Sequence, residues 1–117
     1  MKEVPSFREG KGWAWQAGTG ILLVFFLGFH WVAQHYLAPG GLRTYDQVVA
    51  YVRQPVVLAV EALFLPTVVV HALLGLRAMA LDLGIAPTGL RRLNWVLFLL
   101  GLGAVLYGWW LLGVLVF

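Results

Sequence analysis

Three long apolar stretches, separated by short polar segments, dominate the chain. They run over residues 12–42, 54–76 and 93–117, and Glu61 is their only residue of the types Asp, Glu, Lys and Arg. Each is longer than the roughly 20 residues that a helix needs to cross a hydrocarbon core of about 30 Å. Backbone groups in lipid must pair within their own segment, which favours helices. The pattern therefore predicts an all-α integral membrane fold, a single transmembrane domain over residues 1–117 with helices at about 13–37, 55–83 and 92–117.

Small and turn-forming residues mark where these helices end and where they meet. Residues 38–41, with the sequence Ala-Pro-Gly-Gly, break the first helix, and residues 44–53 form an amphipathic connector of a helical turn or two. In the third helix, Gly101, Ala104 and Gly108 form a seam of small residues that would let another helix approach closely.

Composition and charge narrow the function classes. Hydrophobic residues make up 62% of the 117 residues and charged residues 11%, so the polar surface is too small to enclose a soluble core. The chain has no cysteine, which excludes disulfides and thiolate ligation of zinc or iron–sulfur clusters by this chain. The net charge of +3 comes from basic residues scattered at helix ends, which indicates membrane topology and no nucleic-acid binding.

The basic residues predict the orientation in the membrane. Most of them lie at one end of the predicted bundle, and the positive-inside rule makes that end cytoplasmic. The N-terminus would then face the cytoplasm and the C-terminus the outside, for a multi-pass protein of the cell inner membrane. The basic residues are Lys2, Arg8, Lys11, Arg77, Arg91 and Arg92 at the cytoplasmic end, against Arg43 and Arg53 at the other.

His71 is the sharpest functional candidate, because a polar group deep in lipid costs several kcal/mol unless it is satisfied. It lies about ten residues, or roughly 15 Å, from the cytoplasmic end of the second helix. A neutral imidazole at this depth is a good axial ligand for haem iron, and Gly75, one turn further, would leave room for a flat macrocycle. A packing histidine, bonded to a neighbouring helix, is the competing interpretation.

Arg77 and Asp82 follow His71 on the same helix. Asp82 comes eleven residues after His71, which returns it to nearly the same face at the cytoplasmic boundary, where it would contact a quinone or a haem propionate. Arg77 lies on another face. Its guanidinium would reach a haem propionate or a lipid headgroup, or simply snorkel to the interface.

The first helix repeats this spacing. Thr19 and His30 are eleven residues apart and share a face, with Gln16 close to Thr19. Gln16 and Thr19 lie near the cytoplasmic surface, where they would hydrogen-bond a quinone carbonyl or a haem propionate. His30 lies about 24 Å from the cytoplasmic end of the helix. Because His30 and His71 are at different depths, they would serve two haems rather than a single iron.

Two further ionisable groups lie toward the outer side. Glu61 is roughly two turns inside the outer end of the second helix, so it is protonated, paired across a helix interface or wetted from outside. A structural role is favoured over a proton relay, because nothing else in the sequence is expected to form a relay with it. His35, near the outer interface, is interpreted as exposed or in contact with headgroups.

The run of residues 71–84 resembles the second-helix signature of succinate dehydrogenase membrane anchors, H-x-x-x-G-x-R-x-x-x-x-D. His71, Gly75, Arg77 and Asp82 occupy its four defined positions. The step Gly18-Thr19-Gly20 is similar to the small-Ser/Thr-small step that opens the first helix of the family. The three-helix plan and the chain length match as well.

The resemblance implies one of two anchors of succinate:quinone oxidoreductase (complex II). In that enzyme a flavoprotein with FAD oxidises succinate, an iron–sulfur subunit carries electrons, and the two anchors pack into a bundle that holds haem b and forms the quinone site. This chain would have no complete active site alone. By similarity, His71 would ligate the haem nearer the cytoplasm together with a histidine of the other anchor, and His30 would match the extra histidine of members with two haems.

Two positions depart from the family pattern. The Arg that is usual near the start of the first helix is Ala17 here, and the Tyr that often follows the second-helix Asp is Leu83. The Gly-x-Arg step resembles the C-type anchor, whereas the loss at Ala17 fits the D-type slightly better. Two other functions stay open: the membrane anchor cytochrome b of another respiratory oxidoreductase, and a non-redox membrane scaffold.

Overall fold

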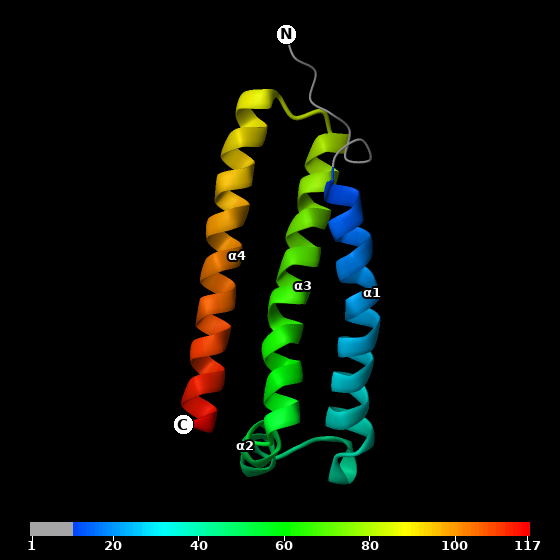
Figure 1. The fold of residues 1–117 in the computed structure, drawn as a ribbon, viewed down its shortest axis with the longest axis vertical. Coiled ribbons are helices and arrows are strands. Elements are labelled where there is room, and N and C mark those ends of the chain that lie inside the picture. Colours follow the sequence, from blue (N-terminus) through cyan, green and yellow to red (C-terminus); the bar gives the residue numbers. More distant parts are fainter. Residues whose placement is uncertain (1–10) are drawn as a thin grey trace.

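A computed structural model describes residues 11–117, and the elements in this range are helices (Figure 1). Three of them are long and apolar enough to cross a membrane, which confirms the predicted all-α transmembrane fold. Lys2 and Arg8, which enter the orientation prediction, lie outside the described residues. The elements are α1 (Gly12–Trp31), a π-helical turn η1 (Val32–Tyr36), a 3-10 turn η2 (Pro39–Gly41), α2 (Tyr45–Val52), α3 (Pro55–Asp82) and α4 (Pro87–Val116).

The third long helix begins one turn earlier than the predicted start near residue 92. Pro87 occupies its first turn, where the fixed φ of proline suits a helix start and its missing N–H is not needed. Only a short connection remains after α3, and Gly84, with φ of +79°, makes the turn.

Beyond Trp31, α1 continues as the π-helical turn η1, and Arg43 connects this turn to α2. The first helix was predicted to continue to residue 37, but its last turn, Val32–Tyr36, is π-helical. Arg43 donates a hydrogen bond of 2.8 Å from Nη2 to the carbonyl oxygen of Ala33 in this turn. The same guanidinium lies 4.5 Å from the ring centroid of Tyr51 in α2, within range of a cation–π contact.

The polar connector folds as the short helix α2. Thr44 precedes it as the N-cap, and its side chain accepts a hydrogen bond from the backbone N–H of Gln47. The Gln47 side chain accepts in return from the N–H of Thr44 at 2.9 Å. This reciprocal pair satisfies two backbone donors that a helix start leaves free, which explains why so short a segment is helical.

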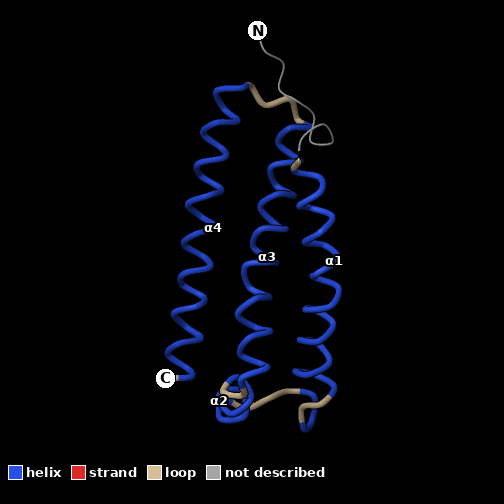
Figure 2. The backbone as a smooth tube through the Cα atoms, viewed as in Figure 1, coloured by secondary structure: helices blue, strands red, loops and turns tan. Residues whose placement is uncertain are grey.

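The helix α3 is central to the bundle. It packs against α1 on one side and α4 on the other, whereas α1 and α4 do not contact each other over their described lengths (Figure 2). One end of the bundle holds the start of α1, the end of α3 and the start of α4, and we call it the N-terminal end; the opposite end is the α2 end (Figure 1). A small buried cluster of Ala33, Tyr51, Val52 and Val57 lies at the α2 end.

Two of the three small residues of the predicted seam in α4, Gly101 and Gly108, lie where α3 packs, whereas Ala104 is exposed. A Cβ atom added at Gly101 would lie 2.6 Å from Cδ1 of Leu73, and one added at Gly108 would overlap the side chain of Leu65. Nearby, Nε1 of Trp109 donates to the carbonyl oxygen of Ala62 at 2.9 Å. The two glycines therefore let α3 and α4 approach closely.

We expect Gly101→Val to weaken the contact between α3 and α4. The new side chain would overlap Leu73, and overpacking of this kind typically costs about 1–3 kcal/mol in the free energy of unfolding. Gly103→Val is the matched control, because a Cβ at Gly103 meets nothing within 4 Å. Thermal unfolding of the detergent-solubilised protein measures both variants. Equal melting temperatures would show that the seam does not determine the packing.

Candidate functional site

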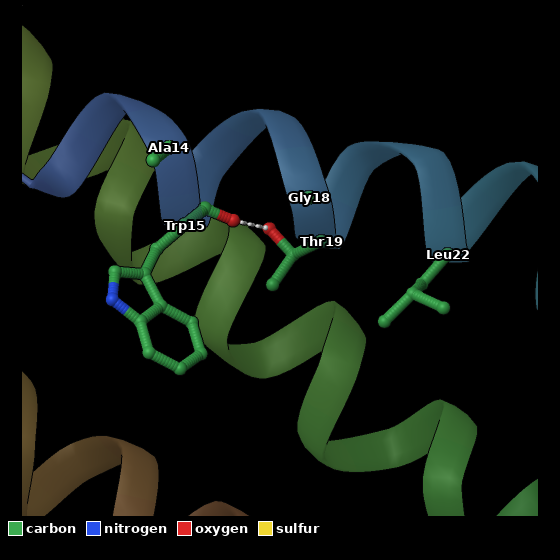
Figure 3. A pocket seen from close by; sticks show the side chains of 5 residues that line it. All are labelled: Ala14, Trp15, Gly18, Thr19 and Leu22. Atoms are coloured by element: carbon green, nitrogen blue, oxygen red, sulfur yellow. Dashed lines mark hydrogen bonds between the residues drawn. The ribbon is translucent and has the colours of Figure 1, made fainter.

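The side chain of His71 is held by α1 through one ring nitrogen. Its Nδ1 lies 3.0 Å from Oγ1 of Thr19 and 3.2 Å from the carbonyl oxygen of Gln16. The Thr19 hydroxyl donates its own proton to the carbonyl oxygen of Trp15 at 2.7 Å (Figure 3). Thr19 therefore accepts from Nδ1–H, and the Gln16 carbonyl is an acceptor in any case. Both partners fix the tautomer of His71 that carries its proton on Nδ1 and its lone pair on Nε2.

A close approach of α1 to α3 makes these hydrogen bonds possible. A Cβ atom added at Gly20 would lie 3.2 Å from Cε1 of His71, so even alanine would require the ring to shift by a few tenths of an ångström. Thr19 is buried at this contact, with 8% of its surface exposed. The predicted step Gly18-Thr19-Gly20 thus positions the imidazole of His71, and Thr19 hydrogen-bonds His71 rather than pointing its hydroxyl outward.

The side chain of Gln16 lies beside Gly75. A Cβ added at Gly75 would lie 3.4 Å from Nε2 of Gln16, an ordinary van der Waals contact with the end of a flexible side chain, so room for a macrocycle next to Gly75 stays a prediction. The other amide atom, Oε1 of Gln16, is buried and has no hydrogen-bond partner within residues 11–117. Gln16 therefore offers an unused polar atom close to His71, whose ring its own backbone carbonyl also holds.

An open apolar groove runs along α1 next to Thr19. Its volume is about 280 Å³, and it is lined by Ala14, Trp15, Gly18, Thr19 and Leu22 (Figure 3). Gly18 leaves the floor of the groove open, since a Cβ there would meet nothing within 4 Å. The groove provides apolar surface beside the residues that hold His71.

A second histidine contact joins the same two helices further toward the α2 end. Nδ1 of His30 lies 2.8 Å and 3.0 Å from the two carboxylate oxygens of Glu61. The ring of His30 packs against Phe64 with a centroid distance of 5.3 Å. The side chain of Glu61 is 11% exposed and that of His30 35% exposed. Pairing across a helix interface was one of the alternatives for Glu61, but His30 was not predicted as the partner, although antiparallel packing of the first two long helices places both residues at a similar depth.

The polar groups of the α2 end continue from Glu61 to Tyr51 and Arg43. The hydroxyl of Tyr51 and Nε of Arg43 are buried without a hydrogen-bond partner among the described residues. Burial raises the pKa of Tyr51 above its ordinary value of 10.0, the charge of Glu61 raises it further, and the charge of Arg43 lowers it. Tyr51 thus lies within the electrostatic field of both residues.

The remaining candidates lie apart from His71. Arg77 donates from Nε to Oδ1 of Asn94 at 2.9 Å, which directs it to α4, whereas His71 contacts α1. Asp82 is exposed at the last residue of α3. His35 is exposed, as expected, and its Nδ1 lies 3.1 Å from the carbonyl oxygen of Gly41. The structure therefore brings together His71, Thr19 and Gln16, and leaves Arg77 and Asp82 outside that group.

Comparison with known proteins identifies the family of the chain. Residues 8–108 match the family model of the succinate dehydrogenase/fumarate reductase transmembrane subunit. The chain is 38% identical over 82 residues to the succinate dehydrogenase hydrophobic membrane anchor subunit of Archaeoglobus fulgidus, a match that covers 70% of this chain and 69% of that protein. No solved structure matches the chain significantly. Since the family model covers most of the chain and the three apolar helices fit it, this protein belongs to the succinate dehydrogenase/fumarate reductase transmembrane subunit family, as a membrane anchor subunit.

Proposed function

We propose that this anchor binds haem b in a succinate:quinone oxidoreductase and that Nε2 of His71 is an axial ligand of the iron. The observation that carries the proposal is the fixed tautomer of His71. Thr19 and the Gln16 carbonyl accept from Nδ1–H, so the lone pair of Nε2 is free to bind a metal. Metal-ligating histidines commonly donate their other N–H to an oxygen in this way, which orients the ring and raises its basicity.

The surroundings of His71 fit a haem. The chain has neither cysteine nor a second histidine at this contact, so a second axial ligand would come from a histidine of the second membrane anchor. Trp15 and Leu22 in the groove beside Thr19 offer apolar surface on which a macrocycle or a partner helix would pack. When bound, the haem supplies a one-electron carrier inside the membrane. Thr19 and Gln16 hold the imidazole against rotation.

A second haem is proposed at His30. His30 of α1 lies at the depth of Glu61, with which it pairs, whereas His71 of α3 lies at the depth of Thr19. The two histidines are therefore at different depths along the pair of helices. One iron would not reach both. The Nδ1 of His30 is also occupied by an acceptor, which leaves its Nε2 for ligation in the same manner.

The quinone would bind at the N-terminal end of the bundle, which we place at the cytoplasmic face of the inner membrane. Arg91 and Arg92 lie at that end, as the positive-inside rule requires. There Gln16 and Asp82 are the groups of this chain that would contact quinone or a haem propionate. Arg77, held by Asn94, would reach a propionate or a lipid headgroup.

The partners follow from the family. An iron–sulfur subunit would dock at the same face and pass on electrons that the flavoprotein, with its FAD, takes from succinate. The D-type anchor is preferred over the C-type, because the Arg that is usual near the start of the first helix is Ala17 here.

Haem content of the intact complex tests this proposal. A pyridine haemochrome assay gives haem, and release of the bound flavin gives the amount of flavoprotein. We expect two haems per flavin. A ratio of one would leave His30 as a structural residue, and a complex without haem would identify the chain as a non-redox scaffold.

A further inference from the structure

We infer that Glu61 is a positioning residue for His30 and that its negative charge lowers the midpoint potential of the haem that His30 ligates. The inference rests on the proposed second haem and goes beyond it, because it assigns a role to a carboxylate that the family signature does not contain. Of the alternatives that the sequence left for Glu61, it builds on pairing across a helix interface.

The geometry gives Glu61 a single direct role. Both of its oxygens lie within 3.0 Å of one nitrogen, Nδ1 of His30, so the carboxylate accepts from that N–H with either oxygen. Phe64, one turn along α3, packs against the same ring and restricts its tilt. The imidazole of His30 is therefore fixed from two sides by α3, with Nε2 left free.

The hydrogen-bond acceptors of the two histidines differ in charge. His71 donates to a hydroxyl and a backbone carbonyl, which are neutral, whereas His30 donates to a carboxylate. A charged acceptor makes a stronger hydrogen bond and a more basic ligand. A more basic ligand and a nearby negative charge both stabilise ferric over ferrous iron, and the low dielectric of the membrane strengthens the effect.

The negative charge is not cancelled by a direct ion pair with a basic side chain of α2 or its connector. Within residues 11–117, the side-chain partner of the Glu61 carboxylate is His30, which as a neutral iron ligand would form a hydrogen bond and no ion pair. Arg43, the nearby cation, instead donates to the Ala33 carbonyl and lies over the Tyr51 ring. Tyr51 is close enough for the Glu61 charge to raise its pKa. Glu61 thus faces His30 with no Lys or Arg side chain directly paired to it among the described residues.

Redox titration of the purified complex, followed by haem absorbance, tests the inference. We expect Glu61→Gln to raise the midpoint potential of one haem and leave the other unchanged, because glutamine keeps an oxygen acceptor but removes the charge. Glu61→Asp keeps the charge and should restore the wild-type potential. Thr19→Val is the matched control, since it removes the hydroxyl acceptor of His71 and should affect only the other haem.

The outcomes separate this inference from the proposed function. Two haems with unchanged potentials in Glu61→Gln would overturn the role of Glu61 and leave the second haem standing. Equal shifts of both haems would also overturn it, because a general field effect does not need the contact with His30. A wild-type complex with a single haem would overturn the second haem and this inference together. Electron paramagnetic resonance of the ferric haems reports ligand orientation independently of electron-transfer activity.

Discussion

Replacing His71 with alanine should remove one of the two haems from the complex and leave the other bound. The substitution deletes Nε2, the proposed ligand. Thr19 and the Gln16 carbonyl lose only the hydrogen bond from the imidazole. Haem absorbance per flavin should therefore fall by about half, because this chain would supply one histidine ligand to each of the two irons. The measurement is the reduced-minus-oxidised spectrum of the purified complex, normalised to flavin.

His35→Ala is the control for this experiment. His35 is exposed, and its Nδ1 contacts the Gly41 carbonyl in its own connector, so its loss should leave both haems in place. His30→Ala should remove the haem that His71→Ala retains. Full haem content in His71→Ala would contradict the assignment, and so would an equal loss in His35→Ala.

Gly20→Val should displace the His71 ring and release or distort the same haem. A single Cβ at Gly20 would already lie 3.2 Å from Cε1 of His71, and valine adds two methyl groups that must fit against the ring or α3. The ring cannot retreat without losing its hydrogen bonds to Thr19 and Gln16. We expect most of the absorbance of this haem to be lost, and Gly20→Ala to shift its spectrum with the haem retained.

Gly28→Val controls for the effect of valine in α1 itself. Gly28 is exposed on the same helix, and a Cβ there would meet nothing within 4 Å. The two variants carry the same helix propensity cost. If both lose the haem to the same degree, the loss comes from the helix and not from the contact between Gly20 and His71.

The helices were predictable from the sequence because the membrane leaves few choices. Apolar runs longer than about 20 residues must be helical in lipid, so the number and approximate position of the long helices follow from hydropathy alone. The winding of η1 and the start of α4 at Pro87 were not predicted. Both depend on local satisfaction of backbone groups, such as the bond from Arg43 to Ala33, which hydropathy does not report.

The site was predictable in its residues but not in its contacts. Spacing and the family signature identified His71, Thr19, Gln16 and His30. All four lie where α1 meets α3, with His71 on α3 and the other three on α1. The roles differ: Thr19 and the backbone of Gln16 hold His71, and the Gln16 side chain covers Gly75.

Which residues of two helices contact each other depends on the register between the helices. The sequence of one helix predicts only which of its residues share a face. Glu61 shows this most clearly. On its own helix it has no partner, yet the antiparallel register of α1 and α3 places His30 directly against it. Aligning the first two long helices in antiparallel orientation would have predicted this pair from the sequence.

The most direct test is the structure of the assembled complex by electron cryomicroscopy, at a resolution that shows the ring of His71. We predict that Nε2 of His71 is bonded to a haem iron, that Nδ1 still faces Thr19 and the Gln16 carbonyl, and that a histidine of the second anchor occupies the opposite axial position. An imidazole of His71 that faces lipid, or an iron-free contact with the neighbouring subunit, would contradict the assignment.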